Sequence, residues 1–133
     1  MHRFVFFVNE ILIFSELFPI FTVIRSIKKK TDSKNKNGIA IASADTVQNR
    51  VIAAQAADEL LNISGISASF VLYPDEDKVI ISARSIGTAN AQMILEPLGG
   101  GGNAATAGAQ LRGTTVKDAL DQLVASIDAY YEA

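Results

Sequence analysis

The sequence predicts a small α/β domain: a mixed β-sheet of about four strands packed with three helices and preceded by an apolar N-terminal arm. Three observations lead to this fold class. The chain has 133 residues, which suits one domain. Apolar residues make up 49% of it and charged residues 20%, so it can bury a core. Strand-type and helix-type hydrophobic periodicities also alternate along residues 38–133.

The predicted order in this region is strand, helix, strand, strand, helix, glycine loop, short strand and helix. These elements fall at residues 38–43, 47–61, 66–72, 79–83, 89–98, 99–102, 103–113 and 116–130.

The first four elements follow from apolar spacing and turn chemistry. The apolar run GIAIAS at 38–43 predicts a buried strand. The next segment has apolar residues three and four apart, which predicts a helix with Asp45 as N-cap and Gln48 as its capping-box partner. Alternation at 66–72 and in the following apolar segment predicts two antiparallel strands, joined by the polar turn PDED at 74–77.

The remaining elements surround a glycine loop. A short helix carries Pro97 in its last turn and stops at the run Gly99 to Gly102. A short strand follows the glycines. The closing helix has a regular apolar face, and Thr115 with Asp118 predicts a capping box at its start.

The N-terminal arm, residues 1–27, has a different character, and a basic linker at 28–37 joins it to the domain at 38–133. Its segment 4–24 contains 15 large apolar side chains in 21 residues, a length that suits a membrane span. Two glutamates, an asparagine and a proline within it oppose insertion. Three interpretations therefore stay open: a membrane-associated or spanning segment, an interfacial helix or secretion-like leader, and a non-native extension.

Charge and composition exclude several classes of function. Residues 38–133 carry five cationic side chains against eleven carboxylates, a formal charge of −6, so duplex DNA is not an expected partner. The chain has no cysteine, and its single histidine is His2. This composition excludes cysteine nucleophiles, thiolate metal sites and a Ser-His-Asp triad in the domain. We therefore expect no familiar catalysis from this chain alone.

The run of four glycines at 99–102 has two interpretations from the residues alone. Glycines are common in flexible linkers and tight packing corners. They also let successive backbone N–H groups converge on a phosphate, which would make an anion cradle. The spacing fits neither a Walker loop nor a dinucleotide fingerprint.

The segment SARS at 82–85, followed by GGGGNAATAGAQL at 99–111, resembles the C-terminal DHH-associated domain of DHH-family phosphoesterases. The similarity is strongest to the membrane-bound cyclic-di-AMP phosphodiesterases of Gram-positive bacteria, in which IAIASAD and ISARS recur in this order. It covers residues 38–133 and none of the arm. The resemblance implies a substrate-binding, nucleotide-binding domain of a hydrolase on the cytoplasmic side of the membrane. It also implies that manganese and the catalytic residues belong to a DHH half that is absent from this chain.

The resemblance assigns substrate contacts to ten residues: Arg84, Ser85, Gly99, Gly100, Gly101, Gly102, Asn103, Thr106, Ala107 and Gly108. It implies that Arg84 clamps a phosphate. Ser85 and the amides of residues 100–102 would contact phosphate or ribose oxygens, and residues 106–108 would shape the turn behind them. Asn103 stands at the family's histidine position and Thr106 replaces an alanine. Asparagine can donate a hydrogen bond but cannot carry a charge or a proton. No catalytic residue or metal ligand is expected in this chain.

These observations predict the substrate-binding domain of a cyclic-di-AMP phosphodiesterase, with cyclic-di-AMP or a short oligonucleotide as ligand. The chain is expected to be inactive by itself. One alternative is a stand-alone α/β interaction or assembly domain that pairs with a separate DHH domain in trans or with a second copy. The other is a truncated gene remnant.

Overall fold

The computed structural model describes residues 4–8, 11–15, 22–28, 38–87 and 89–132. The strands are β1 Phe4–Val8, β2 Ile11–Ser15, β3 Thr22–Lys28, β4 Gly38–Ser43, β5 Ile66–Asp75, β6 Lys78–Ser85, β7 Gly101–Gly102 and β8 Thr106–Arg112. The helices are α1 Arg50–Leu61, α2 Ala91–Leu95, the 3₁₀ turn η1 Glu96–Leu98 and α3 Val116–Glu132.

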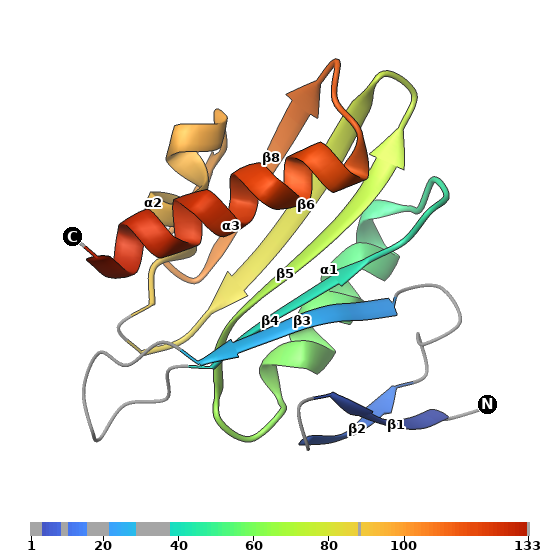
Figure 1. Cartoon of the computed structure of the whole chain (residues 1–133), viewed down its shortest axis with the longest axis vertical. Coiled ribbons are helices and arrows are strands. Elements are labelled where there is room, and N and C mark those ends of the chain that lie inside the picture. Colours follow the sequence, from blue (N-terminus) through green and yellow to red (C-terminus); the bar gives the residue numbers. More distant parts are fainter. Residues whose placement is uncertain (1–3, 9–10, 16–21, 29–37, 88, 133) are drawn as a thin grey trace.

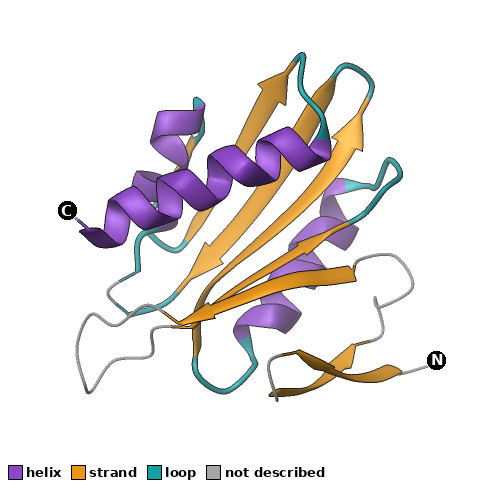
Figure 2. Ribbon diagram, in the orientation of Figure 1, coloured by secondary structure: helices purple, strands orange, loops and turns teal. Residues whose placement is uncertain are grey.

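The main sheet has the strand order β3-β4-β5-β6-β8-β7. β4 and β5 are parallel and are joined through α1, whereas the other neighbours in this sheet are antiparallel. A parallel pair needs such a crossover, and its right-handed form places the helix on one face of the sheet. α3 and α2 lie in front of the sheet and α1 lies behind it (Figure 1). The helices therefore form one layer on each face (Figure 2).

Two apolar clusters fill the spaces between these layers. In front, Phe70, Ile81 and their neighbours on β4 to β8 pack against α2 and against Leu123 and Ile127 of α3. Behind, the alanine-rich face of α1 packs on β4 and β5. The small side chains let α1 approach the sheet closely. The rear-facing residues of β6 are only partly buried, and those of β8 are partly buried or exposed, so this part of the rear face is accessible.

The predicted fold class is confirmed, and the four predicted strands correspond to β4, β5, β6 and β8. The sheet has two further strands. β3 comes from the end of the arm and pairs with β4, and β7 is two glycines long. Neither was predicted, since β3 lies at the boundary between the apolar arm and the basic linker, and glycine has low β-propensity.

The predicted start of the first helix is wrong. Asn49, not Asp45, is the N-cap of α1, and its side chain accepts a hydrogen bond from Ile52 N at 3.0 Å. Gln48 bonds to Thr46 instead of reaching back to Asp45. The predicted cap of α3 is confirmed in part, because Thr115 Oγ1 accepts from Asp118 N at 3.1 Å.

The arm forms strands where the structure describes it. β1 and β2 pair as an antiparallel two-stranded sheet. The described residues contain no helix long and apolar enough to cross a membrane. The basic linker lies outside the described residues, except for Lys28 at the end of β3.

Candidate functional site: a groove on the rear of the sheet

A groove of about 620 Å³ lies on the rear face of the sheet, between α1 and the glycine loop. Its lining comprises Arg50, Ala53, Ala54, Tyr73, Ile80, Ile81, Ser82, Arg84, Gly99, Gly100, Gly101, Thr106, Ala107, Gly108, Ala109 and Gln110. This volume is in the range of pockets that hold small ligands.

The floor of the groove follows from strand alternation. On β6, Val79, Ile81 and Ala83 are buried in the front core, so the residues between them face the rear. β8 alternates in the same way. The antiparallel register then places Arg84 opposite Thr106, Ser82 opposite Gly108 and Ile80 opposite Gln110.

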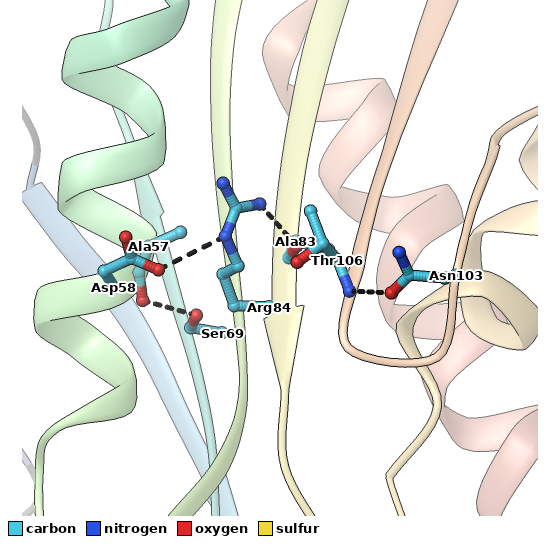
Figure 3. A network of polar contacts seen from close by, with 7 residues as sticks. All are labelled: Ala57, Asp58, Ser69, Ala83, Arg84, Asn103 and Thr106. Atoms are coloured by element: carbon cyan, nitrogen blue, oxygen red, sulfur yellow. Dashed lines mark hydrogen bonds and ion pairs between the residues drawn. The ribbon is translucent and has the colours of Figure 1, made fainter.

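Arg84 is held in place at one end of the floor. Its Nε lies 3.2 Å from Asp58 Oδ1 of α1, and its Nη1 donates to the carbonyl of Ala83 at 2.9 Å (Figure 3). The Arg84 side chain is only 18% exposed, whereas that of Asp58 is 62% exposed. A pair so open to water contributes at most about 1 kcal/mol to stability. Its main effect is geometric, since it fixes the orientation of a guanidinium whose other N–H donors make no hydrogen bond to the described residues.

Asp58 reaches Arg84 because α1 is anchored at this point. The buried hydroxyl of Ser69 on β5 donates to the carbonyl of Ala57 at 2.6 Å (Figure 3). Ser69 also pairs with Arg84 in the β5–β6 register. One buried hydrogen bond thus aligns the end of α1 with the arginine.

The glycine loop forms the opposite wall. A Cβ on Gly100 would lie 2.6 Å from the carbonyl oxygen of Gly108, so only glycine allows this approach to β8. The amides of Gly99 and Gly100 donate to the carbonyls of Glu96 and Leu95. These two N–H groups are therefore engaged within the protein. A Cβ on Gly101 would meet no atom within 4 Å.

Asn103 and Ser85 support the loop beside the groove. Asn103 Oδ1 accepts from the backbone N–H groups of Ala105 and Thr106, each at 3.0 Å. The buried hydroxyl of Ser85 donates to the carbonyl of Ala104 and accepts from Ala91 N at 3.1 Å. Both side chains thus hold the turn that carries Thr106, and neither lines the groove.

The charged side chains that line the groove are cationic, although Asp58 pairs with one of them just outside the lining. The charged lining residues are Arg50 and Arg84, and no carboxylate lines the groove in the described part of the chain. Burial raises the pKa of Tyr73, so this phenol stays neutral near pH 7. The groove therefore offers two guanidinium groups with neutral hydroxyl and amide groups, a donor set that suits an anion.

This donor set does not fit manganese, which takes carboxylate, imidazole and water ligands. Across the described residues, no group of three or more histidine, aspartate or glutamate side chains could hold a metal ion.

Seven of the ten predicted site residues line the groove, and the other three are Ser85, Gly102 and Asn103. Arg50, Ile80 and Gln110 also line the groove and were not predicted, and the pairing of Asp58 with Arg84 was not predicted either. The alternation around Arg84 could have indicated Ile80. No pattern in the sequence indicates that α1 packs beside β6. The positions of Arg50 and Asp58 next to the groove therefore could not be predicted from the sequence.

Comparisons with known proteins identify relatives over the same region. The sequence model of the DHHA1 domain family matches residues 36–133. The chain is 48% identical over 99 residues to the cyclic-di-AMP phosphodiesterase PdeA of Listeria monocytogenes, covering 72% of this chain and 15% of that protein. It is 47% identical over 102 residues to the cyclic-di-AMP phosphodiesterase GdpP of Bacillus subtilis, covering 73% of this chain and 16% of that protein. The chain thus spans about 15% of the length of PdeA.

Two solved structures share the fold. An exopolyphosphatase-related protein from Bacteroides fragilis aligns with a TM-score of 0.63 at 20% identity, covering 71% of this chain and 29% of that chain. The C-Ala domain of alanyl-tRNA synthetase from Aquifex aeolicus aligns with a TM-score of 0.55 at 15% identity, covering 80% of this chain and 96% of that one. These likenesses concern the fold alone.

Proposed function

Since the chain belongs to the DHHA1 domain family, we propose that its groove binds the phosphate of a cyclic or linear dinucleotide and forms the substrate-binding wall of a cyclic-di-AMP phosphodiesterase. The names and sequence identities of PdeA and GdpP support this ligand class. In this proposal, a DHH half outside this chain supplies the metal and the attacking water.

The observation that carries the proposal is the fixed guanidinium of Arg84. Two of its nitrogens are engaged by Asp58 and by the carbonyl of Ala83, so little side-chain freedom is lost when a phosphate binds. Its remaining donors can form charge-assisted hydrogen bonds, which are stronger than neutral ones. Arg84 also lines a groove whose other charged residue is a cation.

The neighbouring wall suits a phosphate for a second reason. Gly101 lines the groove and has no side chain, so phosphate oxygens can approach its backbone. Thr106, opposite Arg84 in the register, adds a hydroxyl group. None of these groups is a general base near neutral pH, so the domain binds and orients while the chemistry belongs to its partner.

Calorimetric titration of the full 133-residue chain with cyclic-di-AMP and its linear product tests this proposal. We expect saturable binding that Arg84→Ala weakens by about 1–3 kcal/mol, the scale of lost hydrogen bonds to a charged group. Arg112→Ala is the matched control, because Arg112 is an exposed arginine of β8 that does not line the groove. Absence of binding, or equal losses in the two variants, would contradict the proposal.

A further inference from the structure

We propose that the end of the groove remote from Arg84 is a nucleobase subsite, in which Gln110 hydrogen-bonds the edge of an adenine-type base that lies between Ile80 and Arg50. This inference rests on the proposed function, because it assigns the second half of the groove that Arg84 begins. It adds the residues that would read the base of a nucleotide whose phosphate is bound by Arg84.

The groove is elongated, because α1 runs alongside the β6 and β8 strands that form its floor. Ile80 and Gln110 face each other four residues along the strands from the Arg84 and Thr106 pair, which is about 13 Å. On α1, Arg50 lies two turns before Asp58. Arg50 also acts electrostatically on Tyr73, which pairs with Ile80 across β5 and β6. Arg50, Ile80 and Gln110 therefore meet at the same end.

The chemistry of this end differs from that of the Arg84 end. Ile80 is partly buried and apolar, so it offers van der Waals contact to the apolar face of a base and no donor for a phosphate. Gln110 is exposed, and within the described part of the chain its amide makes no hydrogen bond. A glutamine amide can donate to and accept from the N7 and N6 edge of adenine at once, as it does in the major groove of DNA.

Arg50 has an unusual position for a structural residue. It is the first residue of α1, whose first turn contains no acidic side chain, and a cation there opposes the helix dipole. Its guanidinium plane can stack on a base across the groove from Ile80. A planar cation, an apolar floor and an amide together match a nucleobase better than a second phosphate.

Base selectivity of the full chain tests this subsite. Titrations would compare the linear diadenylate, the linear diguanylate and ribose 5-phosphate, which has no base. Gln110→Ala is expected to weaken diadenylate binding about tenfold, to reduce the preference for adenine over guanine, and to leave ribose 5-phosphate binding unchanged. Gln122→Ala, an exposed glutamine on α3, is the matched control and is expected to change none of these values.

Each other result would overturn a defined part of the proposal. Binding that depends on Arg84 but shows no adenine preference, or an equal loss for the base-free ligand, would overturn the base subsite alone. No binding of any dinucleotide to the unmodified chain would overturn the proposed function and the subsite with it.

Arg50 has its own test. Stacking needs the guanidinium plane, so Arg50→Lys is expected to weaken diadenylate binding as much as Arg50→Ala does. Full retention of affinity by Arg50→Lys would assign Arg50 to a phosphate and overturn its stacking role.

Discussion

Arg84 divides its five N–H donors between the protein and the groove. Asp58 and the carbonyl of Ala83 engage Nε and Nη1 from opposite sides of the guanidinium, and no contact is drawn to its third nitrogen (Figure 3). An arginine held in this way is preorganised for a phosphate. The ion pair with Asp58 therefore affects binding more than stability.

Replacing Asp58 by asparagine tests this positioning role. We expect Asp58→Asn to weaken dinucleotide binding severalfold while the free energy of unfolding changes by less than about 1 kcal/mol. Because Asp58 acts through Arg84, the effect should vanish in the Arg84→Ala background, which a double-mutant cycle measures. Asp121→Asn on α3 is the control. An effect that persists without Arg84 would show that Asp58 acts in another way.

A substitution at Gly101 can test ligand binding without disturbing the fold. A side chain at Gly101 would meet no protein atom within 4 Å, yet the residue lines the groove. Gly101→Val is therefore expected to fold, as judged by its thermal unfolding, and to lose dinucleotide binding at least tenfold by filling the space of the phosphate. Undiminished binding by a folded Gly101→Val chain would place the phosphate elsewhere.

Gly100→Ala is the matched comparison at the neighbouring position. An added Cβ would lie 2.6 Å from the carbonyl oxygen of Gly108 and 2.9 Å from the Cβ of Ala109. We expect a loss of stability of about 1–3 kcal/mol, the usual cost of overpacking. An unchanged midpoint of thermal unfolding would mean that the loop moves to make room.

At the scale of elements, the N-terminus of α1 positions Arg50. Asn49 caps this helix, and the exposed Val47 lies before it instead of on its apolar face. Asn49→Ala is expected to lower the free energy of unfolding by about 1 kcal/mol, measured by chemical denaturation. Asp45→Ala, at the position that the sequence favoured, should have little effect. A larger loss of stability for Asp45→Ala than for Asn49→Ala would show that α1 begins at Asp45, as the sequence predicted.

The sequence predicted those elements that bury a regular face. β5, β6 and α3 could be predicted because apolar residues recur along them at the period of a strand or a helix. The start of α1 could not, since Asp45 and Asn49 are both good N-cap residues and only packing decides between them. β7 depends on the approach of two glycines to β8, which leaves no apolar pattern.

The candidate site could be predicted only where a motif marks it. Arg84 and most of the glycine loop were predicted as site residues from the family resemblance alone. They lie on the two sides of the proposed phosphate position. In the sequence, Asp58 and Gln110 look like ordinary surface residues. The packing of α1 brings Asp58 to Arg84, and the β6–β8 register places Gln110 in the groove.

Across residues 38–133, the cations gather on one side of the sheet, where Asp58 and Asp77 pair with two of them. Residues 38–133 have a formal charge of −6, yet strand alternation and the groove place four of their five cations on the rear side, namely Arg50, Lys78, Arg84 and Arg112. A local cationic field attracts an anionic ligand within a Debye length of about 10 Å. Raising the salt concentration from about 50 to 300 mM should therefore weaken dinucleotide binding severalfold in titrations. Binding that does not depend on salt would indicate apolar contacts alone.

The most direct measurement of the central claim is a nuclear magnetic resonance titration of the isotope-labelled full chain with the linear diadenylate. We expect the Arg84 Nε–H signal and the Gly101 amide signal to shift first and to saturate together, while signals of α3 on the opposite face stay constant. Saturable shifts that leave Arg84 and Gly101 unchanged would contradict the proposal that this groove binds the phosphate.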